Sequence, residues 1–103
     1  MRIVRLCQAL DEDRIGRVLM SQVLRAGTAI GANLEEGQAA QSKKDFISKV
    51  AIARKEACET HYWLRLLRDC GVVPKDRMDD IIEECDEIAK VLSAIVLSAK
   101  KNP

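Results

Sequence analysis

The stretch FISKVAIARKEACETHYWLRLL, residues 46–67, decides the fold that we expect for this chain. Apolar or small residues recur in it at alternating spacings of four and three, the heptad repeat of helices packed nearly antiparallel in bundles. This first seam consists of Phe46, Val50, Ala53, Ala57, Thr60, Leu64 and Leu67. It predicts a long helix that packs along its whole length against neighbouring helices.

The same stretch carries a second seam of mostly apolar residues, roughly 140° round the helix from the first. Its members are Ile47, Ala51, Cys58, Tyr62 and Leu66. A helix that is apolar on several sides is buried on several sides, and one small domain offers little to cover both seams. We therefore predict a homo-oligomer with Ile47, Cys58, Tyr62, Trp63 and Leu66 at the interface. The alternative is that a short first helix of the same chain covers the second seam.

Three further helical segments flank this one. We expect helices at about residues 2–10, 14–36, 43–69 (with Ser42 as N-cap) and 74–100. No segment shows sustained β alternation, and short connections between long helices favour antiparallel neighbours. The 103 residues are therefore predicted to form one domain, residues 1–103, with an all-α, up-and-down antiparallel four-helix bundle.

The second predicted helix contains a run of small residues, AGTAIGAN, at residues 26–33. Glycine inside a helix costs about 1 kcal/mol relative to alanine, so two glycines four residues apart indicate that something approaches the backbone closely. We expect Gly27 and Gly31 to permit a tightly packed neighbouring helix. Asn33 lies on the aliphatic side, where its amide needs partners. It is expected to fix the helix register or to bond to the chain near Gly37.

A row of basic side chains lies between the two seams. It consists of Lys43, Arg54, His61, Arg65 and Arg68. Such a row is typical of phosphate contacts, which dominate affinity for nucleic acids. The alternative is pairing within the bundle, because residues 74–89 carry seven acidic and two basic side chains. The net charge of +1 predicts no strong field overall.

No feature of the sequence points to a cofactor. The four cysteines form no Cys-x-x-Cys pair and the chain has one histidine, so we expect no metal site. Arg54 and His61 fit a loose spacing found in helical ribonucleases of the HEPN group, which makes such an enzyme a distant alternative. We predict no enzyme activity, no cofactor and no small-molecule substrate. The longest uncharged runs reach about half of a membrane span, so the chain is expected to be cytoplasmic, without a membrane partner.

Three stretches resemble a known family: residues 24–37 (LRAGTAIGANLEEG), 40–49 (AQSKKDFISK) and 57–64 (ACETHYWL). Together they resemble the bacterial four-helix-bundle proteins encoded in intervening sequences of 23S ribosomal RNA genes. That group is similar in fold to the accessory variability determinant of diversity-generating retroelements, a basic pentamer that binds nucleic acid and a reverse transcriptase. The resemblance implies a homopentamer with RNA, DNA or a reverse transcriptase as partner, and it transfers no catalytic residues. The accessory proteins are more strongly basic than this chain.

Two classes of function remain open at this point. The first is a non-enzymatic oligomer that binds RNA or DNA, or that serves a reverse transcriptase as an accessory. The second is an assembly scaffold that binds only protein. Nucleic-acid binding that weakens steeply with salt separates them, because phosphate contacts release counterions.

Overall fold

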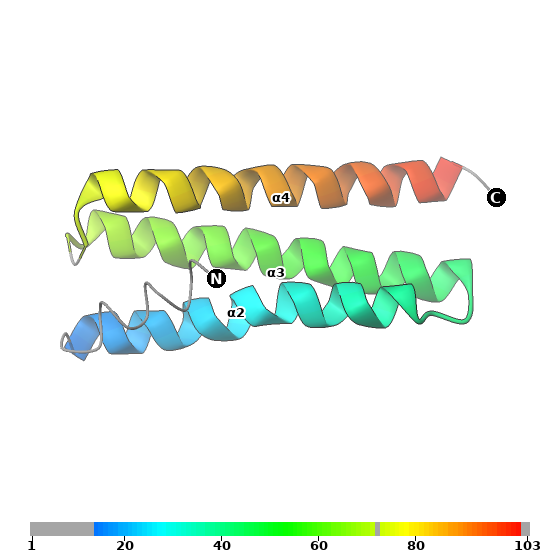
Figure 1. Cartoon of the computed structure of the whole chain (residues 1–103), viewed down its shortest axis with the longest axis horizontal. Helices are drawn as coiled ribbons and strands as arrows, with labels where there is room; N and C mark the ends of the chain where they lie inside the picture. Colours follow the sequence, from blue (N-terminus) through cyan, green and yellow to red (C-terminus); the bar gives the residue numbers. More distant parts are fainter. Residues whose placement is uncertain (1–13, 72, 102–103) are drawn as a thin grey trace.

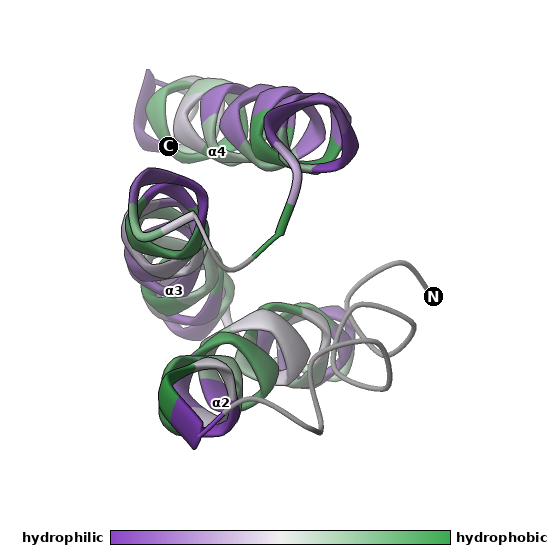
Figure 2. Cartoon of the chain, turned by 90° about the vertical axis from the view of Figure 1, so that its left-hand side faces the viewer, coloured by the Kyte–Doolittle hydropathy of each residue, from purple (hydrophilic) through white to green (hydrophobic). Residues whose placement is uncertain are grey.

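The computed structural model describes residues 14–71 and 73–101, and these residues form three α-helices. The helices are α2 (Arg14–Gln38), α3 (Lys43–Asp69) and α4 (Lys75–Lys101). Each runs antiparallel to the one before it, and α3 lies between α2 and α4 (Figure 1). Figure 2 shows the same order from one end, with α2 and α4 on two different sides of α3.

The predicted four-helix bundle is wrong for the described part of the chain, although the all-α class is correct. The described residues contain three helices, and their bounds match three of the predicted segments within two residues. The fourth predicted helix, at residues 2–10, lies outside the described residues. The physical reason is that α3 packs against both other helices. Two neighbours are therefore enough to bury its first seam.

The ends of α3 follow from local side-chain and backbone chemistry. Ser42 Oγ accepts a hydrogen bond from the Asp45 backbone N–H at 3.1 Å, which satisfies one of the donors that a helix start leaves free. Asp45 also places negative charge in the first turn, where the helix dipole favours it. Beyond the other end, Gly71 adopts a φ of 71°, a left-handed conformation that glycine accepts without steric cost and that turns the chain toward α4.

A first core cluster joins all three helices near the α3–α4 turn. Its buried members are Met20, Val23, Leu64, Leu67, Val73, Met78, Ile81, Ile82 and Cys85. Leu64, Leu67 and Met78 have no exposed surface. Burying one such side chain stabilises a fold by about 1.5–3 kcal/mol, so this end of the structure holds much of its hydrophobic stabilisation.

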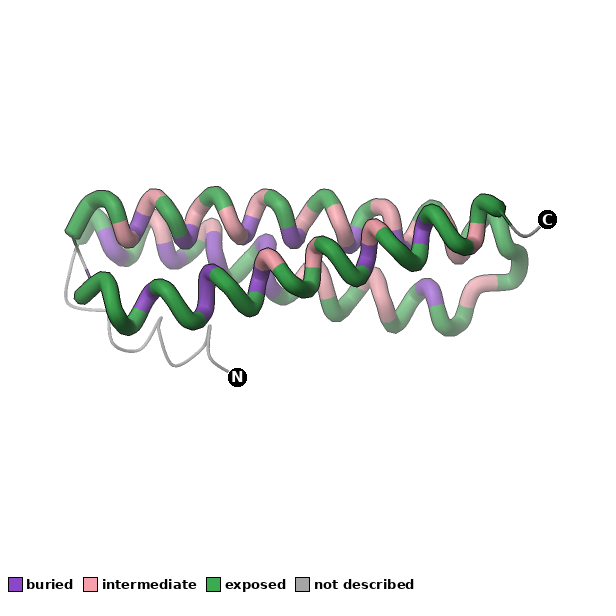
Figure 3. The backbone as a smooth tube through the Cα atoms, turned by 90° about the horizontal axis from the view of Figure 1, so that it is seen from above, coloured by how far each residue is buried: buried purple, intermediate pink, exposed green. Residues whose placement is uncertain are grey.

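A second core cluster lies toward the α2–α3 turn, and its buried members come from α3 and α4 alone. They are Val50, Ala53, Ala57, Leu92 and Val96. Ile30 and Leu34 of α2 pack against them while remaining partly exposed. In Figure 3, buried positions recur along each helix and alternate with exposed ones. This periodicity is what helices buried on one side produce.

The first seam is confirmed as the packing face of α3. Six of its seven residues are buried, and Phe46 at its start is half-buried. Thr60 is the polar exception, with no exposed surface. Its Oγ1 donates to the Glu56 carbonyl oxygen at 2.7 Å, so the buried hydroxyl has a partner within its own helix.

Candidate functional site

The second seam differs in exposure along α3, because Ile47 and Ala51 pack against the second core cluster. Tyr62 is 50% exposed, and Cys58 carries an exposed free thiol. Ile47 and Leu66 are half-buried, and the neighbouring Ile52 is 37% exposed. The helix that buries six of the seven residues of the first seam therefore leaves part of the second seam exposed, at Cys58 and Tyr62.

Trp63 stands apart from the other predicted interface residues. Its side chain packs against the first core cluster, and its indole N–H donates to Glu59 Oε1 at 3.3 Å. The Tyr62 ring meets it edge-on, with 5.2 Å between ring centroids. The structure thus leaves Cys58 and Tyr62 exposed and Leu66 half-buried, whereas Ile47 and Trp63 each pack against a core cluster of their own chain.

The basic row follows the edge of α3 that lies next to α4. Arg68 Nη1 is 3.8 Å from Asp79 Oδ1 of α4, and Arg68 Nε is 3.1 Å from Asp69 Oδ1. Two carboxylates therefore offset the charge of Arg68. The alternative prediction, that the basic row pairs with acidic residues of the last helix, is therefore correct for Arg68.

Lys43, Arg54 and Arg65 form no ion pair with any residue in the described ranges. They are spaced 11 residues apart, which is three helical turns or about 16 Å, so they follow one edge of the helix. Lys43 and Arg65 are exposed and Arg54 is half-buried. We call these three residues the cation line.

His61 lies between Arg54 and Arg65 on the same edge. Burial lowers its pKa from the ordinary 6.5, and the nearby Arg65 and Arg68 charges lower it further, while Asp86 of α4 opposes them. The imidazole is therefore mainly neutral at pH 7. The positive charge of the row at this pH comes from its lysine and arginines.

Comparison with known proteins places the chain in a family. A family model described as 23S rRNA-intervening sequence protein matches residues 1–94. The chain belongs to this family. A solved structure from Bacteroides thetaiotaomicron VPI-5482, described as a protein with unknown function from the S23 ribosomal protein family, is 43% identical. The match covers 92% of this chain and 88% of that one, with a TM-score of 0.86. A comparison with curated proteins finds no match.

The predicted resemblance to 23S rRNA-intervening sequence proteins is thus confirmed. The further likeness to the accessory variability determinant of diversity-generating retroelements stays a prediction, because neither comparison bears on it. The same holds for the pentamer and the reverse transcriptase that this likeness implied. The protein from Bacteroides shares the fold of this one, and its description names no activity.

The small-residue run of this intervening-sequence protein lies on α2. Gly27 is buried, whereas Gly31 is exposed, and a Cβ added at Gly31 would have no atom of another described helix within 4 Å. No described helix therefore makes the close approach that was predicted at Gly31. Asn33 Nδ2 donates to the Ala29 carbonyl oxygen at 2.8 Å, so its amide is satisfied inside α2 and not near Gly37.

The sequence reasoning missed an ion-pair cluster between α2 and α3. Arg25 Nη1 is 3.5 Å from Glu56 Oε2, and Arg25 Nη2 donates to Glu59 Oε1. Hydrogen bonds from Trp63 and Arg25 lower the pKa of Glu59, against the effect of burial. The available signal was the spacing of the two glutamates, three residues apart on the edge opposite the basic row. Glu56 and Glu59 thus lie on the edge of α3 next to α2, whereas the basic row lies on the edge next to α4.

Two further observations concern the described residues. Within residues 14–71 and 73–101, no group of three or more His, Cys, Asp or Glu is placed to hold a metal ion. No helix in these ranges is both long enough and apolar enough to cross a membrane.

Proposed function

We propose that this protein is a non-enzymatic, self-associating RNA-binding protein whose cation line contacts phosphates. The observation that carries the proposal is the placement of Lys43, Arg54 and Arg65 at three-turn intervals on one edge of α3, without ion pairs to described residues. Cations that are already neutralised gain little from a phosphate, whereas unpaired ones release counterions from the nucleic acid.

The solved relative supports RNA as the ligand rather than DNA, because its description refers to a ribosomal protein family. The net charge of +1 adds no long-range attraction. Binding therefore depends on the local line, and three phosphate contacts predict a salt slope of about −2 for a single strand.

Charge reversal on the cation line tests the proposal. Fluorescence anisotropy with a labelled 23S rRNA fragment is measured for the wild type and for Arg54→Glu/Arg65→Glu between about 50 and 200 mM salt. We expect at least about tenfold weaker binding for the variant and a slope that is flatter by about 1.4. Arg14→Glu/Arg17→Glu is the matched control, because both arginines are exposed on α2 and form no ion pair with a described residue.

The control variant should bind RNA within about twofold of the wild type if the contacts are confined to α3. Absence of any anisotropy change with wild-type protein at the lowest salt contradicts RNA binding. Equal losses in the two double variants contradict the assignment to the cation line, because net charge alone then governs the affinity.

Self-association is supported by the open second seam. An exposed tyrosine flanked by half-buried aliphatic residues resembles the apolar centre of a protein interface more than an ordinary solvent-facing side of a helix. Multi-angle light scattering at micromolar concentration should give a mass that is a multiple of 11.5 kDa. A wild-type monomer under these conditions contradicts self-association.

The open seam also supports the protein-only scaffold as a second candidate. An assembled protein that binds no RNA at low salt favours the scaffold over the RNA-binding protein. The ribonuclease alternative places Arg54 and His61 two turns, or about 10 Å, apart on one edge. It requires RNA cleavage that disappears in His61→Ala.

A further inference from the structure

Four lysines gather where α3 begins and α4 ends. Lys43 and Lys44 are the first two residues of α3, and Lys100 and Lys101 are the last two of α4. The antiparallel packing brings these two helix ends side by side (Figure 1). None of the four forms an ion pair with another described residue.

The acidic side chains near this end do not cancel the charge. Glu36 of α2 is held by Lys49 Nζ at 2.9 Å, and the hydrogen bond between them raises the pKa of Lys49. Asp45 is the acidic residue in the first turn of α3. The end of the structure therefore carries an excess of positive charge.

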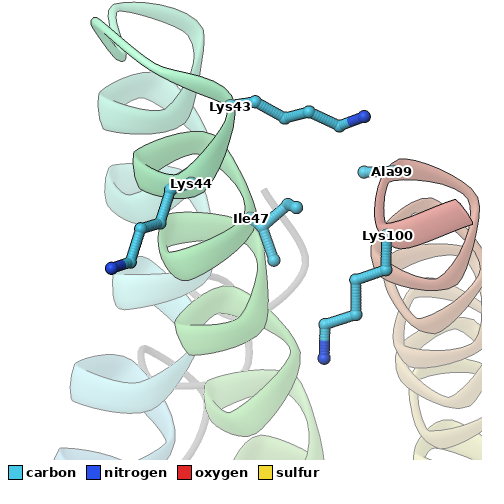
Figure 4. Close-up of a pocket in the computed structure, with 5 residues that line it drawn as sticks. All are labelled: Lys43, Lys44, Ile47, Ala99 and Lys100. Atoms are coloured by element: carbon cyan, nitrogen blue, oxygen red, sulfur yellow. The ribbon is translucent and has the colours of Figure 1, made fainter. Parts of the chain in front are cut away.

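A cavity of about 340 Å³ lies between the two helix ends. It is lined by Lys43, Lys44, Ile47, Ala99 and Lys100. In Figure 4, Lys43 and Ile47 extend from α3 toward α4, and Lys100 lies below Ala99 on α4, whereas Lys44 points away from the gap. Two ammonium groups therefore flank a cavity whose other walls are apolar.

A second cavity of about 560 Å³ shares Lys43 and Ala99 with the first. Its remaining lining residues are Phe46, Val91, Ala94, Ile95 and Ser98. Val91 is 58% exposed and Ile95 is 36% exposed, so the apolar wall is open to solvent. An aromatic ring and aliphatic side chains beside a cation suit a flat, apolar-faced group that carries a negative charge at one end.

We propose that this end of the bundle holds one unpaired nucleotide of a bound RNA. A phosphate lies between Lys43 and Lys100, and the base enters the second cavity against Phe46, Val91 and Ile95. The inference rests on the proposed RNA binding and adds a preference for single strands, because a base stacked in a duplex cannot enter a side-chain cavity. Lys43 belongs to both sites, so a strand that follows Arg65 and Arg54 reaches the cavities.

The test uses two RNAs and two variants outside the cation line. Anisotropy is measured with a labelled 12-nucleotide single strand and with a blunt 12-base-pair duplex. We expect about threefold weaker binding of the single strand by Lys100→Gln and about tenfold weaker binding by Val91→Glu, with duplex affinity changed by less than about twofold. The matched controls are Lys75→Gln, at the other end of α4, and Val18→Glu, which is 64% exposed on α2.

The possible results separate this inference from the proposed function. If Lys100→Gln and Val91→Glu bind both RNAs like the wild type while Arg54→Glu/Arg65→Glu loses both, the nucleotide site is overturned and the cation line stands. Equal losses for single strand and duplex overturn the base-binding cavity, because only backbone contact remains. If wild-type protein binds neither RNA, the proposed function fails and this inference fails with it. Circular dichroism checks that the variants keep their helices.

Discussion

The two seams of α3 are similar in apolar content but differ in how far their side chains are exposed. Leu64 and Leu67 of the first seam have no exposed surface, whereas Tyr62 of the second is 50% exposed. Both seams share one backbone, so the difference comes only from the neighbouring helices. The regular spacing of four and three marks the seam that other helices of the same chain cover. The less regular seam stays partly exposed, at Cys58 and Tyr62.

The largest effect should come from opening a cavity in the first seam. Leu64→Ala is expected to lower the free energy of unfolding by about 3 kcal/mol, because a fully buried leucine leaves a void that the core fills only in part. Leu97→Ala, at a position 60% exposed on α4, should change it by less than about 0.5 kcal/mol. Urea denaturation measures both values. Similar losses for the two leucines contradict the assignment of Leu64 to the core.

A charged residue introduced into the second seam should weaken self-association without lowering the stability of the fold. Tyr62→Glu places a carboxylate at the centre of the proposed interface and should raise the dissociation constant at least about thirtyfold. Ile15→Glu, at a position 61% exposed on α2, is the control and should assemble like the wild type. Light scattering gives the mass, and far-ultraviolet circular dichroism gives the helix content. An unchanged mass for Tyr62→Glu removes the second seam as the interface.

A smaller effect is expected from the polar member of the first seam. Thr60→Val keeps the side-chain shape and removes the hydroxyl that donates to the Glu56 carbonyl oxygen. That carbonyl still accepts its backbone hydrogen bond within the helix. The free energy of unfolding should therefore change by about 1 kcal/mol or less. Thermal unfolding measures the change. A loss as large as that of Leu64→Ala shows that the hydroxyl has a structural role beyond this bond.

The smallest effect concerns His61, which lies between the two seams. Its pKa is lowered in the folded chain, chiefly by burial, so the unfolded chain binds the proton more readily. Neutral His61 contributes fully to the stability of the fold above pH 6.5, the ordinary pKa of histidine. Below pH 6.5 this contribution declines as the pH falls toward the lowered pKa. His61→Gln should therefore flatten the fall in melting temperature between about pH 6.5 and pH 5. An identical pH profile contradicts this prediction.

The periodicity of the sequence predicts which sides of a helix are apolar, and it does not predict what covers them. Three helices and the whole first seam follow from spacing, because each depends on residues close in sequence. The four-helix bundle is wrong for the described residues, which form three helices, and the predicted helix at residues 2–10 lies outside them. The resemblance to the family could be predicted because it rests on contiguous residues.

Contacts between distant residues could not be predicted from one sequence. Arg25 meets Glu59 across 34 positions, and the pairing depends on the register between α2 and α3. Trp63 was assigned to the interface because it lies on neither seam, yet the approach of α2 brings it to the first core cluster. Which members of the basic row form ion pairs also depends on the register between α3 and α4. Asp79 reaches Arg68, whereas no described residue pairs with Arg54 or Arg65.

The second seam winds around its helix. Its members follow spacings of four, seven, four and four residues, and each step of four advances about 40° around the axis. Between Ile47 and Leu66 the line turns by about 100°. A rod parallel to α3 touches only part of such a line, whereas a helix inclined to the α3 axis follows more of it. In the proposed assembly, copies joined by such oblique crossings would be rotated relative to one another, which gives a twisted arrangement and not a flat one.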